Sequence, residues 1–475
     1  MEKADKINQN KQSKYQNICQ VTHISLGFLF LYVAFNSTQN LTSILLDQDG
    51  YGKLGFYSLG VQAIFQGIGS LMSSGIVNKF GVKTSMVLGA LFNSSWVLQS
   101  LIPAQRYYNQ DSDNWAYSET FYYIINIIVS AASGFMGSIL WVAEGKYISE
   151  CATEETKGFY FSYFWMFYMQ SQVFGNLIAA LVLGEMDQVS YFIIMSVIAF
   201  IASISFAFLR QPKKVATNEE VSISLFTPEN INLSSAHNRE STPDFNSSAG
   251  LLQSQMPKKR GFWNDVHRVW SLMISKRMLL FLPQLLWIGV SIAIYSGLLV
   301  TIIQTSLTEE TIDKKNEKSM LALVAFGFGE IFGALIIGQI VDRVNSRIAS
   351  LFNCLFIAIA TILTIIFLKH EQYNWFTFLM AFMWGVEDGS ANTHALEMLG
   401  FEFDDNTDPF AIFSMFEALA VFIFQIIQSR VNDTQKFIIY IAVVGGVGTV
   451  MCGATYFFSF KEKRSNNKEL MNQEQ

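Results

Sequence analysis

Three carboxylic residues lie inside long apolar stretches of the sequence: Glu330, Asp388 and Glu417. An ionised side chain at bilayer depth is costly unless it faces a partner or a water-filled cavity, so each of the three is a functional candidate. No Lys or Arg lies at a comparable depth in these stretches. The alternative, that each carboxyl group is a hydrogen-bonded packing residue, stays open.

Neutral polar residues occupy the matching depth in the first half of the chain. Hydrogen bonds between helices account for many such residues, but we single out Gln66, Gln170 and Asn176 as candidates for the lining of a solute cavity. His394, near the end of an apolar stretch, could titrate near neutral pH. A structural hydrogen bond is the commoner role for a lone His near an interface.

The sequence contains no pattern that is typical of an enzyme. A phosphate-cradling loop, a metal-ligand cluster and a nucleophile–base arrangement are all missing. The four cysteines lie far apart and mostly within apolar stretches, which indicates neither a disulfide framework nor a metal site. We therefore expect no catalytic residue, no metal, no cofactor and no nucleic-acid partner.

Most of the chain consists of apolar stretches that are long enough to cross a bilayer. Hydrophobic residues make up 51% of the sequence and charged residues 15%, whereas about a quarter of the residues of a soluble protein are charged. The sequence therefore predicts an all-α membrane protein with twelve transmembrane helices and the lipid bilayer as a partner. The expected helices are near 17–41, 55–78, 84–102, 119–144, 158–184, 189–209, 279–305, 319–341, 348–368, 373–398, 410–429 and 437–459.

The twelve expected helices form two groups of six with polar segments around them. The segment between the groups is rich in Asn, Ser, Thr and Glu and cannot build a core, although its last part has the spacing of an amphipathic helix on the membrane surface. A solvated linker is the alternative for that part. The expected units are a disordered N-terminal tail over 1–16, a six-helix bundle over 17–209, a linker over 210–278 with an interfacial helix over 262–277, a second bundle over 279–459, and a tail over 460–475.

Lys and Arg predict the orientation of the helices. Most of these residues lie in alternate connections, the set that includes both tails and the central linker. Basic residues favour the cytosolic side. The rule weakens for the long linker, but the bias keeps its sign without it. We expect both termini in the cytosol of a multi-pass protein of the plasma membrane or an endomembrane.

The two groups of helices carry a weak internal repeat. A shift of the second half by 264 positions places Glu330 on Gln66 and aligns the ends of the second helix of each half. These ends carry related motifs, and the paired residues are Gly338 with Ser74, Asp342 with Asn78, and Arg343 with Lys79, followed by Gly81 in the first half. Parallel repeats are typical of transporters with a binding site between the halves.

The motifs at these helix ends resemble the loop motif of the major facilitator superfamily. Within it, the chain from about 17 to 460 resembles the Unc-ninety-three family. The residues that carry this resemblance are Gly27-Phe28-Leu29, Gln39-Asn40-Leu41, Gly158 to Phe164, Gln170-Ser171, Gly175-Asn176-Leu177, Phe262-Trp263, Lys276-Arg277, Trp384-Gly385-Val386 with Asp388 and Thr393, Phe410-Ala411, and Glu417-Ala418-Leu419. Glu144 and His394 depart from the family pattern, because both stand where we expect Gln.

The resemblance implies a fold of two six-helix halves whose eighth, tenth and eleventh helices line a central cavity. Three carboxyl groups without a cationic partner would then suit a proton or a cation. The first functional hypothesis is a secondary carrier that moves a small cationic or polar solute by alternating access, with or without protons. The second, which the family also supports, is an accessory protein that regulates or traffics a membrane partner such as a potassium channel or a receptor.

Two glycosylation sequons lie on the expected outer side. Their acceptors are Asn40 and Asn432. Both lie close to the membrane, so we expect poor glycosylation at either one.

Overall fold

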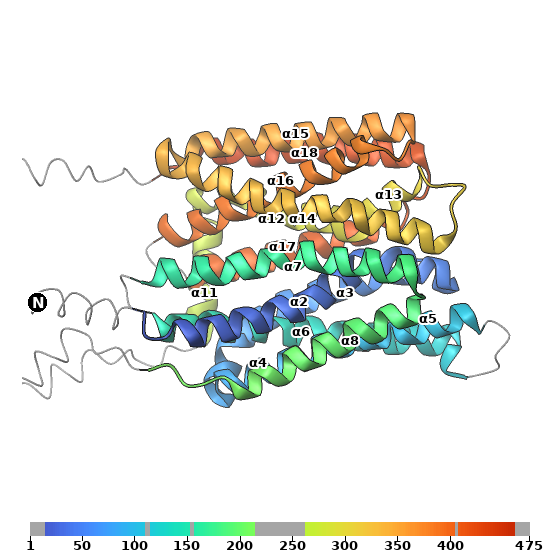
Figure 1. Ribbon diagram of the computed structural model, residues 1–475. Helices are drawn as coiled ribbons and strands as arrows, with labels where there is room; N and C mark the ends of the chain where they lie inside the picture. Colours follow the sequence, from blue (N-terminus) through green and yellow to red (C-terminus); the bar gives the residue numbers. More distant parts are fainter. Residues whose placement is uncertain (1–14, 110–114, 153–155, 214–261, 404–406, 461–475) are drawn as a thin grey trace, which may run out of the picture.

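The computed structural model describes residues 15–109, 115–152, 156–213, 262–403 and 407–460 as a bundle of long helices (Figure 1). The first half comprises α2 (Ile18–Leu46), η1 (Asp47–Tyr51), α3 (Leu54–Phe80), α4 (Val82–Gln99), α5 (Leu101–Tyr108), η2 (Trp115–Tyr117), α6 (Glu119–Cys151), α7 (Lys157–Glu185), α8 (Gln188–Ser205) and η3 (Phe206–Phe208). The second half comprises α12 (Lys276–Ala293), η5 (Ile294–Leu299), α13 (Val300–Gln304), α14 (Ile312–Arg343), α15 (Ser346–His370), α16 (Trp375–Phe401), α17 (Thr407–Gln428), α18 (Thr434–Ala454) and η6 (Thr455–Phe457).

Ten helices in this structure are long and apolar enough to cross a membrane. α3 and α16 fall outside that group, although each has 27 residues and lies within the same bundle. The reason is their polar content: α16 contains Glu387, Asp388 and His394, and α3 contains Gln62 and Gln66. The observed set is thus compatible with the twelve expected crossings.

The bundle has an inner end, where α2 begins and α18 ends, and an outer end, where α2 ends and α18 begins. Helix starts at both ends are fixed by side chains that accept hydrogen bonds from the first turn. Asn374 caps α16 at the outer end in a capping box with Thr377, and Ser275 caps α12 at the inner end. These caps help set the position of α16 and α12 beside the site described below.

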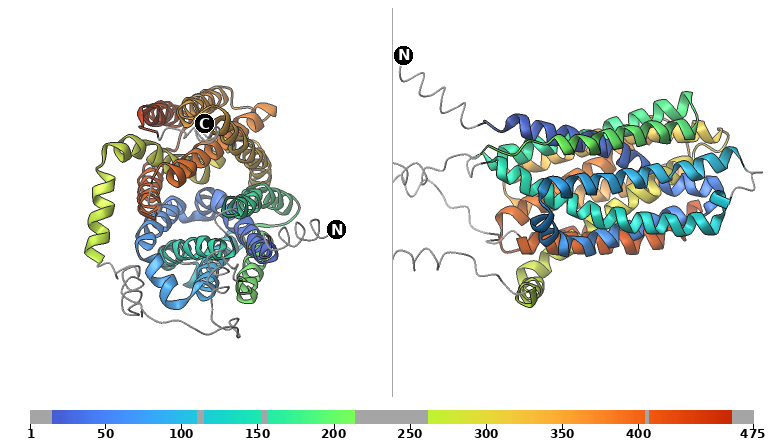
Figure 2. Two further views of the ribbon diagram at one scale, coloured as in Figure 1. Left: turned by 90° about the vertical axis from the view of Figure 1, so that its left-hand side faces the viewer. Right: turned by 90° about the horizontal axis from the view of Figure 1, so that it is seen from below.

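A further helix, α11 (Phe262–Met273), crosses beside the bundle at its inner end (Figures 1 and 2). It is joined to α17 by an ion pair in which Arg268 donates to Asp408. This helix falls within the interfacial helix expected over 262–277. Its position at a membrane surface remains a prediction.

The two halves contact one another mainly through α7 with α14, α3 with α17, and α2 with η5, and less extensively through α2 with α13 and α3 with η5. The element η5 is a π-helical turn that continues α12, and it contains Tyr295 and Gly297. Such turns interrupt regular α-helix and are often found at functional sites. In this molecule the turn lies where the two halves meet.

Candidate functional site

Glu330 lies at the closest contact of two helices of the second half, α14 and α16. A side-chain carbon on Gly385 would collide with the carbonyl oxygen of Phe326 and lie 2.9 Å from the backbone nitrogen of Glu330. One on Gly389 would lie 2.8 Å from the Cα atom of Glu330. The absence of side chains at these two glycines therefore lets α16 lie directly against the backbone around Glu330.

Asp388 precedes the second of these glycines, and its carboxyl group interacts with the Glu330 carboxyl group. Both residues are buried, at 5% exposure for Asp388 and 8% for Glu330. Within the described part of the chain, Glu330 Oε2 and Asp388 Oδ1 have no hydrogen-bond partner. Among the described residues, neither carboxyl group forms an ion pair with Lys or Arg.

The first half faces this carboxyl pair through α7, which runs antiparallel to α14. Asn176 of α7 donates a hydrogen bond to the carbonyl oxygen of Leu323, at 3.0 Å. A side-chain carbon on Gly327 would lie 2.8 Å from the backbone nitrogen of Val173. Continued along the antiparallel pair, this register places Gln170 level with Glu330.

Two tyrosines complete the surroundings of the carboxyl pair. Tyr168 on α7 and Tyr295 on η5 are both half-buried. Their hydroxyl groups interact electrostatically with each other and with Glu330, Asp388 and Glu417. The site thus receives tyrosine side chains from both halves and carboxyl groups from the second half only.

A small pocket of about 60 Å³ lies between the halves beside Glu417. It is lined by Gln39, Gln62 and Gln66 of the first half and by Ser414 and Glu417 of the second half. This volume is enough for about two water molecules. The polar groups on both of its sides could bind a small polar group.

Glu387, which the sequence analysis did not predict, is buried next to Asp388 but faces α12. Its carboxyl oxygens accept hydrogen bonds from Trp287 Nε1 at 2.5 Å and from Ser291 Oγ at 2.7 Å. The adjacent acidic pair in an apolar stretch was the available signal for Glu387. Tyr168 and Tyr295 offered no such signal, because both lie within aromatic or apolar runs.

The other predicted cavity residues lie in different surroundings. Gln66 lines the pocket, whereas Gln170 is half-buried and donates to the carbonyl oxygen of Met166 in its own helix. Asn176 belongs to the contact between the halves, where it also accepts a hydrogen bond from Asn40. None of these contacts by itself assigns a role in solute binding.

His394 lies apart from the carboxyl pair, between α12, α15 and α16. Its Nδ1 atom is 3.2 Å from Gln284 Nε2 and 3.1 Å from Asn353 Nδ2, and its Nε2 atom is 3.1 Å from Ser346 Oγ. The two amide groups are donors, so Nδ1 accepts and Nε2–H donates to the serine. This arrangement is that of a neutral, hydrogen-bonded imidazole.

The predicted gating motifs lie at the inner end, on α3 and α14. Asn78 accepts a hydrogen bond from Lys146 at 2.7 Å, and Lys79 lies over the ring of Phe80. Gly81 has a φ of 85°, a conformation that favours glycine. In the second half, Gly338 lies in α14, which ends at Arg343, an exposed residue. The side chain of Asp342 lies outside what the structure describes.

The two glycosylation acceptors differ in exposure. Asn40 is 1% exposed, and its amide donates to Gln172 and Asn176. Asn432 is exposed near the outer end and accepts a hydrogen bond from Lys436. Only Asn432 of the two presents an amide to the surroundings.

Three amide side chains join the halves at the outer end of the bundle. Gln48 Nε2 donates to Gln304 Oε1 at 3.2 Å, Gln304 Nε2 donates to Asn316 Oδ1 at 2.9 Å, and Asn316 Nδ2 donates back to Gln48 Oε1 at 3.2 Å. We call this arrangement the amide ring. Each amide donates one bond and accepts one, so the ring joins η1 of the first half to α13 and α14 of the second half.

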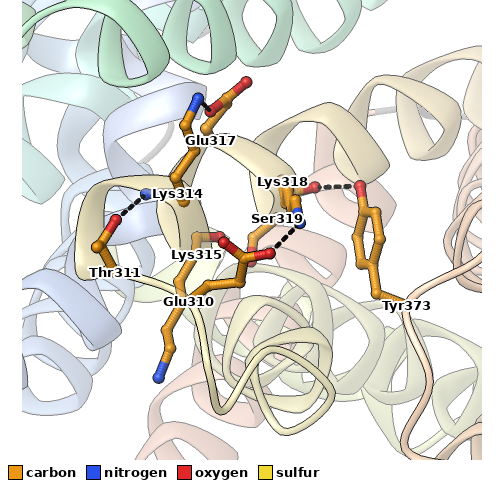
Figure 3. Close-up of polar contacts among 8 residues, drawn as sticks. All are labelled: Glu310, Thr311, Lys314, Lys315, Glu317, Lys318, Ser319 and Tyr373. Carbon is orange, nitrogen blue, oxygen red and sulfur yellow. Dashed lines mark hydrogen bonds and ion pairs between the residues drawn. The ribbon is translucent and has the colours of Figure 1, made fainter.

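Charged residues surround the first turns of α14 beside the amide ring (Figure 3). Lys314 pairs with Glu317 at 2.6 Å, and Lys318 pairs with Glu310. A side-chain carbon on Gly184 of α7 would lie 2.7 Å from the carboxyl carbon of Glu317. This end of α14 therefore contacts the first half closely.

Comparison with known proteins agrees with this architecture. The sequence matches the Major Facilitator Superfamily over residues 24–425. The UNC93-like protein MFSD11 of Xenopus tropicalis is 21% identical over 438 residues, which cover 85% of this chain and 88% of that protein. The expected resemblance to the Unc-ninety-three family is confirmed.

Solved structures of xylose transporters share the fold. The crystal structure of a D-xylose-proton symporter superimposes with a TM-score of 0.64 at 12% identity, covering 94% of this chain and 98% of that one. The inward-open xylose transporter XylE from E. coli superimposes with a TM-score of 0.60 at 14% identity, covering 96% and 98%. The predicted fold class is thus confirmed, and the fold is that of multi-pass membrane transporters.

Proposed function

Because the chain belongs to the major facilitator superfamily, we propose that it is a secondary carrier that moves a small cationic or polar solute by alternating access and couples this movement to protons. The observation that carries the proposal is the pair formed by Glu330 and Asp388. Their carboxyl groups lie together in the middle of the bundle, and each has an oxygen atom without a hydrogen-bond partner. Such a pair could bind and release a proton or a cation during transport.

Two carboxylates that lie side by side away from water repel each other. A proton shared between them, or a cation bound to both, relieves this repulsion. No Lys or Arg among the described residues performs that role for Glu330 or Asp388. An exchangeable proton or cation is therefore the proposed occupant of the pair.

The position of the site also supports a carrier. Glu330, Asp388 and Glu417 belong to the second half, whereas Tyr168, Gln62 and Gln66 face them from the first. A solute held between the halves is exposed to one side or the other as the halves rock. The orientation that we propose places the inner end in the cytosol, in line with the distribution of Lys and Arg.

The test is solute movement by the purified full-length protein in proteoliposomes with an imposed pH gradient. Potassium, organic cations and amino acids are the solutes to be screened. We expect wild-type flux to depend on the gradient. Glu330→Gln and Asp388→Asn should insert normally and lose this dependence, because an amide cannot exchange the proton.

Glu387→Gln is the matched control, since it neutralises a buried carboxyl group on the same helix that is already hydrogen-bonded by Trp287 and Ser291. We expect this variant to keep gradient-driven flux. Flux that survives both Glu330→Gln and Asp388→Asn would remove the pair from the mechanism. Absence of wild-type flux for every solute would contradict the carrier.

A further inference from the structure

Four aromatic side chains of the first half pack together, and one of them, Tyr168, interacts with the carboxyl groups of the second half. They are Tyr32 of α2, Trp141 of α6, and Trp165 and Tyr168 of α7, and we call them the aromatic box. The ring centroids lie 5.3 Å apart for Tyr32 and Trp141, 5.0 Å for Trp141 and Tyr168, and 5.2 Å for Trp165 and Tyr168. The rings thus form one continuous surface built from three helices.

Only one ring of the box is closed off. Tyr32 is 4% exposed, but Trp141, Trp165 and Tyr168 are half-buried. Trp and Tyr at the surface of membrane proteins gather at the two water interfaces. That preference does not explain Tyr168, because the register of α7 against α14 places it within about one helical turn of Glu330, near the middle of the bundle.

Carboxyl groups interact with two rings of the aromatic box, Tyr168 and Tyr32. Glu330, Asp388 and Glu417 are close enough to Tyr168 to interact with it electrostatically. Glu144 interacts with Tyr32. Glu144 is 5% exposed, and its Oε1 atom has no hydrogen-bond partner among the described residues. Two rings of the box thus interact with acidic groups that lack cationic partners in the part of the chain that the structure describes.

We propose that the substrate of this carrier is an organic cation, whose ammonium group lies between Tyr168 and the carboxyl groups and whose apolar part packs on Trp141 and Trp165. The electron-rich faces of Trp and Tyr attract an ammonium group within about 6 Å of the ring centroid. Rings also offer apolar surface, which a hydrated inorganic ion cannot use. This inference rests on the proposed carrier function and names the substrate class of the same site.

The division of the site between the halves gives the cation a role in the transport cycle. The rings come from α2, α6 and α7, and Glu330, Asp388 and Glu417 come from α14, α16 and α17. A ligand that contacts both sets favours the conformation in which they lie closest together. An organic cation would therefore stabilise the closed contact between the halves, whereas a proton on the carboxyl pair alone would not engage the rings.

The test measures binding and does not require transport. The thermal unfolding of the purified full-length protein in detergent is followed with benzyltrimethylammonium as the probe. Sodium, potassium and the neutral analogue N,N-dimethylbenzamide are compared at equal concentration. A ligand that binds the folded state raises Tm in proportion to the logarithm of its concentration above Kd. We expect a concentration-dependent rise of Tm with benzyltrimethylammonium alone.

Variants of Tyr168 show whether the rings hold the cation. Tyr168→Leu should weaken binding of benzyltrimethylammonium about two- to thirty-fold, because the ring face is lost. Tyr168→Phe keeps the ring and should bind within about twofold of wild type. Tyr163→Leu is the matched control: Tyr163 is also half-buried on α7, but it packs on Phe159 and Phe167, outside the box.

The outcomes separate this inference from the carrier proposal. Equal effects of benzyltrimethylammonium and its neutral analogue on Tm, or unchanged binding by Tyr168→Leu, would overturn the organic-cation site. Flux of another solute would leave the carrier intact in that case. Selective binding that Tyr168→Leu weakens and Tyr163→Leu preserves would support the site, even if no flux were found and the carrier proposal failed.

Discussion

The buried carboxyl groups on the two sides of α16 differ in their hydrogen bonding. On the side that faces α12, Glu387 accepts hydrogen bonds from Trp287 and Ser291. On the side that faces α14, Glu330 and Asp388 meet across glycine backbone and each keeps an unpartnered oxygen. Asp388 and Glu387 are neighbours in sequence, so the difference comes from the helix face and not from depth in the membrane.

This comparison refines the rule that a charged residue inside a membrane is functional by default. Glu387 is as deep as Asp388 and more completely buried, at 0% exposure against 5%. Its hydrogen bonds join α16 to α12 and give it a structural use. Unsatisfied hydrogen-bonding capacity, and not the presence of a carboxyl group, therefore indicates where a proton or a solute would bind.

The largest expected effect on stability comes from adding a side chain where α16 contacts the backbone of α14. Gly385→Ala would force a methyl group against the carbonyl oxygen of Phe326 and the backbone around Glu330. Overpacking of a tight contact costs about 1–3 kcal/mol, and more where backbone is the obstacle. We expect a loss of stability of about 3 kcal/mol or more, measured by thermal unfolding in detergent.

Gly400→Ala is the control, because it makes the same change on the same helix where no atom of the described residues lies within 4 Å of the added carbon. Its effect should stay below about 1 kcal/mol. Equal stability of the two variants would mean that α14 and α16 are not held in this close contact. Glu330 and Asp388 would then not be brought together by a glycine contact.

A smaller effect is expected on the α12 side. Glu387→Leu leaves the indole N–H of Trp287 and the hydroxyl group of Ser291 without their acceptor inside the bundle. A buried donor that loses its partner costs about 1–3 kcal/mol, so we expect Tm to fall. Glu387→Gln retains an acceptor oxygen and should fall by less.

Asp388→Asn provides the comparison for Glu387→Leu. Asp388 Oδ1 has no hydrogen-bond partner among the described residues. Asn keeps one acceptor oxygen and gains an amide that can donate to the Glu330 carboxyl group, so the replacement should change the unfolding free energy by less than about 1 kcal/mol. A stability loss at Asp388 as large as that at Glu387 would contradict the distinction. Both carboxyl groups would then be packing residues.

Local patterns of the sequence predicted the helices and three of the buried carboxylic residues. The apolar stretches predicted the helices, because a spanning helix must be long and apolar, and depth in those stretches selected Glu330, Asp388 and Glu417. The same reasoning could not separate Asp388 from Glu387. That difference depends on how α16 is rotated against α12 and α14, which is set by glycine contacts with residues more than fifty positions away.

The positions of Tyr295 and of the amide ring could not be predicted from local sequence patterns. Tyr295 lies on a π-helical turn, which alters the helical spacing from which its direction would be inferred. The amide ring joins Gln48 to residues more than two hundred and fifty positions later. In the sequence each of its members is only a neutral polar residue near the end of an apolar stretch.

The smallest expected effect concerns the amide ring, where polar groups between the halves are fully paired. If hydrogen-bonded groups hold the two halves together, breaking the ring should favour conformations in which the outer end is open. Asn316→Leu removes two of the three bonds, those with Gln48 and Gln304. A hydrogen bond between membrane helices is worth about 0.6 kcal/mol on average. Of the two bonds lost, the one with Gln48 joins the halves, and its loss corresponds to about a threefold change in the population of an outer-open state.

The measurement is the rate at which a maleimide labels a cysteine placed beneath the ring by Ser43→Cys. Ser43 is 1% exposed and lies against the carbonyl oxygen of Gly297 of the other half, so labelling requires the outer end to open. Cys19 is exposed and is replaced by Ser in this background. We expect Asn316→Leu to accelerate labelling about threefold.

Lys314→Ala is the control on the same turns of α14, because its ion pair with Glu317 is exposed and does not join the halves. Equal labelling rates in the two variants would show that the paired amides do not hold the outer end closed. Faster labelling of Asn316→Leu alone would extend the distinction drawn at α16, between paired groups that hold elements together and unpaired groups that are free to bind, to the contact between the halves.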